Sequence, residues 1–241
     1  MKITYIGHSG FMAELEGVDL LFDYYNGELP EREADKPFLV FVSHRHPDHY
    51  NPEIFEWMAA YPEIKFVLSK DVPVKREIQK YKEKGMDLAA HLVTAVKNTT
   101  FSVELATGEE VKIETFKSTD EGVAFLLECE GHTIYHAGDL NLWVWEEESE
   151  QYNQNMTKAY FAQLEKLKDR EIEAAFVPLD PRQGKDAFGG MESFLEYTQT
   201  EAIFPMHFWE KYEIIEAFRE AHPEYSRRIQ KIAYAGENFT L

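Results

Sequence analysis

The chain has 241 residues, of which 44% are hydrophobic and 14% aromatic, so it can bury a substantial core and is not expected to be disordered. Asp and Glu number 44 and Lys and Arg number 25, which gives a formal net charge of −19. No cluster of basic residues offsets this charge, so we expect neither nucleic acid nor an anionic membrane as a partner.

Strands dominate the first half of the predicted fold. Residues 2–6 alternate as a strand does, and residues 11–15 and 18–22 predict a hairpin. The continuous apolar run at residues 38–42 is typical of a strand buried on both faces. Asn51 then caps a predicted helix. The elements expected after it are a strand over residues 65–68, a helix over 74–83, and strands between residues 90 and 130 with turns at Asn98, Gly108 and Gly122.

Helices and strands alternate in the second half. Strands are expected over residues 133–136, 174–178 and 202–204, and helices over residues 154–170, 191–199 and 213–221. A short strand ends the chain. Because no linker or repeat divides it, residues 1–241 are expected to form one α/β domain.

Ionisable residues follow several of these strands, at residues 44–49, 139, 180 and 207. Open α/β sheets build their sites at the carboxyl ends of strands. The recurrence therefore predicts a functional site at one edge of the fold.

The segment after residues 38–42 places three imidazoles and a carboxylate within six residues: His44, His46, Asp48 and His49. In extended backbone alternate side chains share a face, so His44 and His46 can bind one metal ion while Asp48 and His49 serve a second. This ligand set suits zinc, iron or manganese. The alternative is a solvated polar turn with histidines there by chance.

This segment resembles the HxHxDH signature of the metallo-β-lactamase superfamily, and three further features match that family in order. The opening residues 7–11 and 21–23 resemble its first strands. Residues 133–139 resemble its strand ending in Gly-Asp, which implies that Asp139 bridges two metals. Residues 204–207 resemble its terminal motif, which implies that His207 binds the second metal. Within the superfamily the chain looks most like the ascorbate-6-phosphate lactonase-like branch.

The resemblance implies a four-layer αβ/βα sandwich with two divalent metal ions (zinc, manganese or iron) at one edge. Such ions lower the pKa of bound water and polarise a substrate oxygen. The implied reaction is hydrolysis of an ester-like bond in a small molecule, a lactone or a phosphodiester, with Asp48 as the candidate catalytic proton acceptor. Two alternatives stay open: a degenerate, non-catalytic metal-binding domain that acts through partners, and a di-iron redox site. A homo-oligomer is also left open.

The chain departs from the family at one ligand. The family has a further histidine before the strand that starts near Val123, but no histidine lies between His91 and His132. Asp120 is the best substitute, and a carboxylate there shifts the first site from zinc towards manganese or iron. That site is then expected to be the weaker one. The alternative is that Asp120 is an ordinary turn residue.

Five other residues are candidates near the site. Asp23 can orient a ligand histidine or cap a turn, and His8 can line a substrate pocket or serve the turn. His136 is expected to support the site rather than bind a metal. Asp180 and Arg182 can line the pocket, where Arg182 would bind a substrate carboxylate or phosphate, or they can simply pair with each other.

The tryptophans, the single cysteine and the absence of a long apolar run give three further expectations. The tryptophans near these motifs can wall a substrate pocket or complete the core, and the core is the more usual place for them: Trp143, Trp145 and Trp209. Cys129 is the only cysteine, which excludes an intrachain disulfide and fits a reducing compartment. No signal-peptide pattern opens the chain and no long apolar run interrupts it, so a cytoplasmic location is expected.

Overall fold

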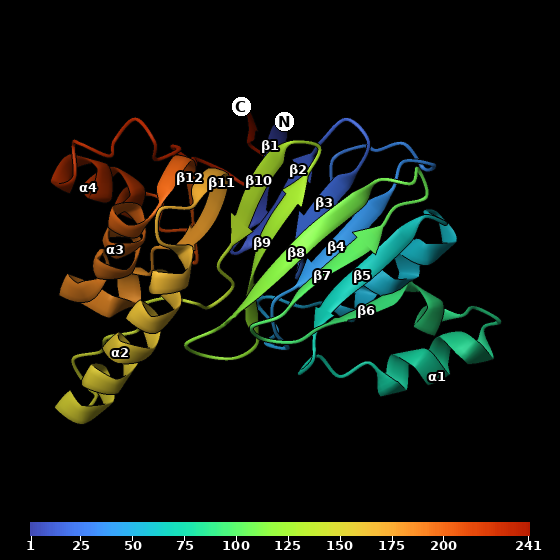
Figure 1. The fold of residues 1–241 in the computed structure, drawn as a ribbon, viewed down its shortest axis with the longest axis horizontal. Helices are drawn as coiled ribbons and strands as arrows, with labels where there is room; N and C mark the ends of the chain where they lie inside the picture. Colours follow the sequence, from blue (N-terminus) through green and yellow to red (C-terminus); the bar gives the residue numbers. More distant parts are fainter.

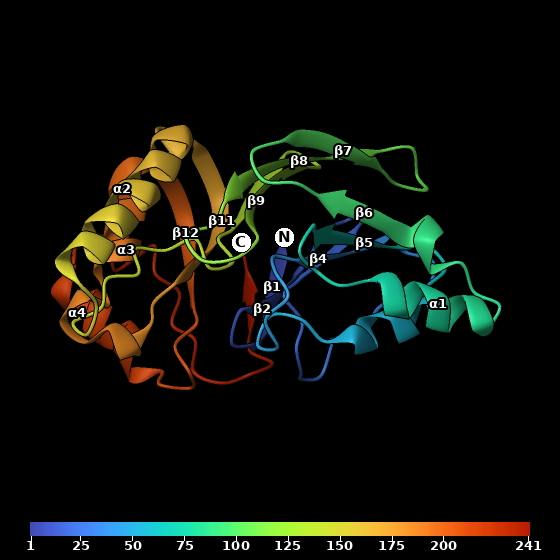
Figure 2. The same cartoon turned by 90° about the horizontal axis from the view of Figure 1, so that it is seen from below.

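Two β-sheets pack face to face in the computed structural model, which describes residues 1–241 (Figure 1). The seven-stranded sheet has the order β13-β1-β2-β3-β4-β5-β6 and the six-stranded sheet the order β12-β11-β10-β9-β8-β7. Helices cover the outer faces, with α2, α3 and α4 on one side of the molecule and α1 on the other (Figure 2). The expected four-layer arrangement is confirmed.

The seven-stranded sheet begins with antiparallel strands and continues with parallel ones. Its members are β1 (Lys2–Gly7), β2 (Gly10–Glu14), β3 (Asp19–Phe22), β4 (Phe38–Val42), β5 (Ile64–Ser69), β6 (Leu92–Ala95) and β13 (Asn238–Thr240). Strands β3 to β6 are parallel, while β1 is antiparallel to β2 and β2 to β3, so β1 runs in the same direction as β3. The carboxyl ends of β1, β3 and β4 therefore share one edge.

The six-stranded sheet follows the same plan, with antiparallel strands first in the chain and parallel strands after them. Its members are β7 (Thr100–Glu104), β8 (Glu110–Lys117), β9 (Val123–Cys129), β10 (His132–His136), β11 (Glu171–Pro178) and β12 (Gln199–Met206). Strands β10, β11 and β12 are parallel, and β8 runs with β10 because both are antiparallel to β9. Four carboxyl ends again meet at one edge.

The helices are α1 (Lys75–Glu83), α2 (Glu150–Leu167), α3 (Gly189–Tyr197) and α4 (Glu213–Ala221), with 3-10 turns η1 (Pro52–Ala59), η2 (Leu88–His91) and η3 (Pro181–Asp186). Helices α2 and α3 differ at both ends from the expected residues 154–170 and 191–199, and the helix expected after Asn51 is the 3-10 segment η1. Helix α2 starts earlier because the Ser149 hydroxyl accepts a hydrogen bond from the Tyr152 amide and caps the helix there. Helix α3 ends earlier because Thr198 is extended and Gln199 already begins β12.

Most of the core lies between the two sheets, in a cluster of 48 buried residues. Aromatic rings join the sheets: Phe11 stacks on Phe176 at 4.4 Å between ring centroids, and Phe41 meets Phe125 edge-on at 5.3 Å. A second cluster of 16 buried residues fills the space between the seven-stranded sheet and its helices. Strand β4 is fully buried, as its continuous apolar sequence predicts.

Strand β13 pairs with β1 and brings the end of the chain back to its start, where the Leu241 amide donates to the Met1 carbonyl at 3.0 Å. None of the helices combines the length and apolar character that crossing a lipid bilayer would require.

Candidate metal centre

Residues from six strand ends gather at the shared edge of the two sheets. His8 follows β1, Asp23 follows β3, the segment 43–49 follows β4, Asp139 follows β10, Asp180 follows β11 and His207 follows β12. The carboxyl ends of parallel strands are where α/β folds place their ligands. The sheet order thus brings together residues that are almost 200 positions apart in sequence.

The first group of donor atoms, which we call site A, consists of His44, His46 and Asp139. His44 Nε2 lies 3.0 Å from His46 Nδ1 and 3.4 Å from Asp139 Oδ2. Burial and the neighbouring His49 lower the pKa of His44 to about 4, so its ring is neutral at pH 7 and can act as a ligand. His46 is more open, with 39% of its side chain exposed.

The second group, site B, consists of Asp48, His49 and His207 with the other oxygen of Asp139. His49 Nε2 lies 3.2 Å and His207 Nε2 3.4 Å from Asp139 Oδ1. His8, Asp48, His49 and His207 form one group of potential ligands. One ligand atom of each lies within 4.8 Å of those of the other three. Asp139 thus presents one carboxylate oxygen to each site, the geometry of a bridging ligand.

The charges at the centre are strongly coupled. Burial alone would raise the pKa of the Asp139 carboxyl, but the imidazoles of His49, His207 and His44 hold that pKa well below its ordinary value. Burial alone would lower the pKa of His49, but the Asp139 and Asp23 carboxylates raise it well above that of a free imidazole. The Asp139 and Asp23 carboxylates together thus favour a positive charge at this point of the centre.

These residues fit divalent metal ions. Ligand atoms held at about 2.1 Å from a tetrahedral metal lie about 3.4 Å from one another, which matches the spacings in both sites. Three buried atoms at the centre have no hydrogen-bond partner: His8 Nε2, His49 Nε2 and Asp139 Oδ1. Unpaired buried polar atoms are costly, and a cation between them would satisfy them. Imidazole and carboxylate donors together favour zinc, manganese or iron.

Asp23 orients one imidazole of each site through hydrogen bonds on the Nδ1 side of the ring, directly for His49 and through Ser43 for His44. It is fully buried, and its Oδ2 accepts from His49 Nδ1 at 2.7 Å and from the Ser43 hydroxyl at 2.6 Å. Since that hydroxyl donates to Asp23, it must accept from His44 Nδ1, which lies 2.9 Å away. Asp23 therefore keeps protons on both Nδ1 atoms and leaves both Nε2 atoms free to bind metal.

Asp180 does the same for His207. Its Oδ2 accepts from His207 Nδ1 at 2.9 Å and from Trp209 Nε1 at 3.3 Å, while Arg182 Nε donates to both carboxylate oxygens. Asp180 is completely buried behind His207. The expectation that it lines the substrate pocket therefore needs correction: its oxygens are occupied, and it orients His207 and Arg182.

His136 is a support and not a donor to either site. Its Nε2 donates to the Ser9 carbonyl at 2.9 Å, and its Nδ1 accepts from the Gly138 amide at 3.1 Å. The ring stacks on Phe22, with centroids 5.0 Å apart and planes 5° apart. Both ring nitrogens are thus used in fixing the loop that carries Asp139.

The backbone at this edge is unusual. His8, Asp23 and His207 all have positive φ, at 52°, 43° and 64°. Non-glycine residues rarely adopt this conformation, and such strain concentrates at functional sites. It turns each side chain out of the strand alternation and into the centre.

Asp120 lies in the β8–β9 turn beside site A. Its Oδ2 is 3.8 Å from His46 Nδ1, and about half of its side chain is exposed. The turn is held against the metal-binding segment by the Val123 amide, which donates to the Ser43 carbonyl at 3.0 Å. Burial and the nearby Asp139 raise the pKa of Asp120. Asp120 is therefore adjacent to the donors of site A but outside their cluster, and its role as a ligand stays a prediction.

A cavity of about 160 Å³ opens beside Asp139 and His207. The other residues that line it are Thr119, Asp120, Trp143, Trp145, Tyr152, Met156 and Arg182. Both indoles wall this cavity, which is the pocket alternative for Trp143 and Trp145, and Trp143 is at the same time buried. Their rings stack with centroids 5.9 Å apart, and Trp143 Nε1 donates to the Asp139 carbonyl at 2.9 Å.

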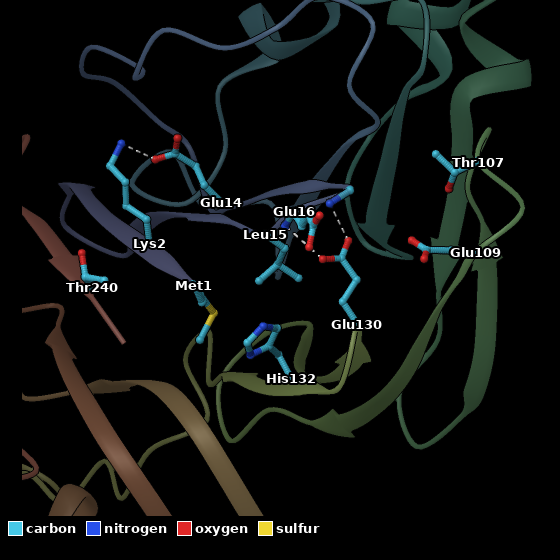
Figure 3. A pocket seen from close by; sticks show the side chains of 11 residues that line it. Met1, Lys2, Glu14, Leu15, Glu16, Thr107, Glu109, Glu130, His132 and Thr240 are labelled. Atoms are coloured by element: carbon cyan, nitrogen blue, oxygen red, sulfur yellow. Dashed lines mark hydrogen bonds and ion pairs between the residues drawn. The ribbon is translucent and has the colours of Figure 1, made fainter.

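A larger cavity of about 880 Å³ lies at the opposite ends of the strands, where β1 begins and β2 ends (Figure 3). There the Glu130 carboxylate accepts from the backbone amides of Glu16 and Gly17 at 3.0 and 2.9 Å, so it caps the β2–β3 turn. Lys2 pairs with Glu14 at 2.6 Å. The groups of potential metal ligands all lie at the other edge of the sheets.

Sequence reasoning missed three contributors to the site. Ser43 directly precedes the histidine motif but looks like an ordinary strand end. Tyr152 and Met156 lie on α2 and reach the cavity together because residues four apart share a helix face. That spacing was visible in the sequence, but nothing in it showed which face of α2 meets the site.

Comparisons with known proteins agree with this geometry. A family model described as "Beta-lactamase superfamily domain" matches residues 2–155. A UPF0173 metal-dependent hydrolase of Exiguobacterium sp. is 22% identical over 213 residues, which cover 86% of each chain. Igni18, a metallo hydrolase of the archaeon Ignicoccus hospitalis, shares the fold with a TM-score of 0.64 at 19% identity, over 100% of this chain and 98% of that one. CmlA, a diiron β-hydroxylase of Streptomyces venezuelae, shares it with a TM-score of 0.62 at 9% identity, over 100% of this chain and 54% of that one.

Proposed function

Because this chain belongs to the beta-lactamase superfamily and is a metal-dependent hydrolase, we propose that it hydrolyses a small ester-like substrate that carries a negatively charged group. The substrate is a lactone or a phosphodiester. Its charged group, a carboxylate or a phosphate, binds to Arg182. The observation that supports this most directly is the position of Arg182 on the wall of the cavity beside Asp139 and His207.

Arg182 is held in place for such a contact. Its Nε and Nη2 atoms donate to Asp180, and its guanidinium lies over the Trp209 ring at 4.5 Å. Nη1 makes no hydrogen bond within the chain, and 48% of the side chain is exposed. It is the only lysine or arginine that lines the cavity, in a chain with a net charge of −19. A fixed guanidinium is well suited to a carboxylate or phosphate.

The cavity also limits the size of the substrate. At about 160 Å³ it is smaller than the roughly 300–1,000 Å³ of pockets for drug-sized ligands. Trp143, Trp145 and Tyr152 supply apolar surface for the body of the substrate and exclude water from the reacting bond. The resemblance to the lactonase-like branch makes a phosphorylated lactone the first substrate to test.

Metal ions at sites A and B would supply a water of lowered pKa and polarise the oxygen of the scissile bond. The residues of the chain bind the substrate and accept the proton. Arg182 binds the charged group and sets the orientation of the substrate. Asp48 stays ionised, because His8 and His49 lower its pKa although burial alone would raise it. As an ionised carboxylate it can accept the proton released during hydrolysis, and its lowered pKa makes it a weak base that passes the proton on readily.

A di-iron redox site is the second candidate. Asp120 favours it, because a carboxylate 3.8 Å from His46 would make site A richer in oxygen donors. A non-catalytic domain has less support, because the unpaired buried atoms at the centre match an open metal site beside a cavity. Elemental analysis and a hydrolysis assay separate all three candidates.

The test uses substrates in matched pairs, each lactone or phosphodiester with and without an added carboxylate or phosphate. A charge-assisted hydrogen bond contributes about 1.5–3 kcal/mol, so kcat/KM should favour the charged member by about 10- to 150-fold. Arg182→Gln should remove this preference and leave hydrolysis of the neutral member within about threefold. Lys185→Gln is the control, because Lys185 is exposed and pairs with Glu146 outside this cavity.

Two results would contradict the proposal. Equal kcat/KM for both members of every pair would mean that Arg182 binds no anion. An equal loss for both members in Arg182→Gln would mean that Arg182 acts only through Asp180 and His207.

A further inference from the structure

The His8 side chain makes no hydrogen bond that explains its position. It is buried at the carboxyl end of β1, with φ at 52° and 7% of its surface exposed. Its Nε2 is among the buried atoms without a hydrogen bond. The resemblance to known hydrolases assigned it no metal, and it does not line the cavity beside Asp139.

The His8 ring is aimed at site B. Its Nε2 lies 3.4 Å from Asp48 Oδ2, longer than the usual 2.7–3.2 Å of an N–H to oxygen hydrogen bond. Neighbouring ligand atoms that lie about 2.1 Å from one five-coordinate ion are roughly 3.0–3.6 Å apart, and this separation falls within that range. The same potential ligand cluster includes His49 and His207.

The ring cannot easily swing away. It packs against His207 at 4.3 Å and edge-on against Trp209 at 4.5 Å between ring centroids. The backbone is fixed too, because the His207 amide donates to the His8 carbonyl at 3.2 Å. A backbone hydrogen bond therefore joins His8 at the end of β1 to His207 at the end of β12, across the two sheets.

We propose that His8 is a direct ligand of site B, and that site B therefore binds its metal ion before site A. With His8, site B has five donor residues: His8, Asp48, His49, His207 and Asp139. Site A has three, and one of them, His46, is substantially exposed. Because more ligands in a more buried site bind a metal ion more tightly, site B should fill first. Site A lacks one histidine of the family pattern, and site B has one more.

The test is X-ray absorption spectroscopy of the full chain loaded with one equivalent of zinc. The proposal predicts three imidazole nitrogens around zinc, from His8, His49 and His207. Two would overturn it, because site A offers only His44 and His46, and site B without His8 offers only His49 and His207. Failure to bind zinc, manganese or iron at all would overturn the metal centre itself, a distinct result.

Variants give a second readout. Asn tolerates positive φ, so His8→Asn keeps the backbone while removing the imidazole. It should weaken the tightest zinc site by more than about 100-fold and reduce the imidazole count to two. Loss of a group that only orients a ligand costs about 10- to 100-fold, so a loss of 100-fold or less would overturn the role as ligand.

Two matched controls complete the experiment. His44→Asn should leave three imidazoles around the first zinc, since that ion occupies site B, and a drop would overturn the order of binding. His132→Asn should change nothing, because His132 pairs with Glu173 at 2.6 Å far from the centre. Thermal unfolding of the metal-free variants establishes that each one is folded.

Discussion

Replacing Asp23 by Asn should weaken both metal sites without touching either one. The side chains have the same shape, and Asn tolerates the positive φ of Asp23. Asn can still accept from the Ser43 amide, as Asp23 does at 2.7 Å. Its NH₂ group would then face His49 Nδ1 and the Ser43 hydroxyl, where the carboxylate now accepts two hydrogen bonds.

His49 must then present a bare Nδ1 to the new donor and carry its proton on Nε2, the atom that faces Asp139. Removal of such an orienting partner costs about 10- to 100-fold in metal affinity, or about 1.4–2.8 kcal/mol. Site B should lose the most, since His49 contacts Asp23 directly. Site A should lose less, because His44 is held through Ser43.

The assay is competition for zinc with a chelator of known affinity, with ¹⁵N NMR to show which nitrogen of His49 carries the proton. Asp19→Asn is the control for loss of stability. Asp19 is equally buried and pairs with Arg32 at 3.0 Å and Lys36 at 2.7 Å, away from the centre. Breaking that pair should cost about 3–5 kcal/mol of unfolding free energy with no change in metal affinity. Wild-type affinity at both sites in Asp23→Asn would refute the reasoning.

Three further predictions concern other parts of the chain. Asp120→His should increase the preference of site A for zinc over manganese by at least tenfold in a competition assay. Unchanged selectivity would mean that Asp120 is only a turn residue. Gly122→Ala should lower the melting temperature far more than Gly108→Ala. Both glycines have positive φ, but only a Cβ at Gly122 would clash with a neighbour, the Ser43 carbonyl; equal shifts would contradict this. Burial, with Glu130 and Glu109 nearby, raises the pKa of Cys129 to about 12, so iodoacetamide at pH 8.5 should label only unfolded protein. Stability should fall as pH rises above about 8.5, where only the unfolded thiol ionises; equally fast labelling of the folded chain would refute the assignment.

The sequence predicts the features that depend on local residue patterns, such as strand bounds and the spacing of ligands within one segment. The apolar run of β4 has the bounds that its composition indicates, and the spacing of His44 and His46 does bring their ring nitrogens together. The layer order followed from the resemblance. The single domain and the cytoplasmic location stay predictions.

The side-chain directions and cavity contacts at the site could not be predicted, because they depend on strand ends that are far apart in sequence and meet only in the fold. The positive φ at His8 and Asp23 rotates their side chains away from the alternation that strand patterns assume. The core was the favoured alternative for Trp143 because aromatic residues usually fill cores, but its loop lies beside Asp139 and places its indole on the cavity wall. Asp180 was assigned to the pocket from its position in sequence, and only the fold shows His207 in front of it.

The central claim is that Asp139 joins two metal sites. It is tested most directly by counting metal per chain in wild-type protein and in Asp139→Asn, each purified without tag or chelator. The account predicts close to two ions per chain in the wild type and a loss at both sites in the variant, because one carboxylate oxygen faces each site. A wild-type chain that binds no metal, or a variant that still holds two ions, would contradict it.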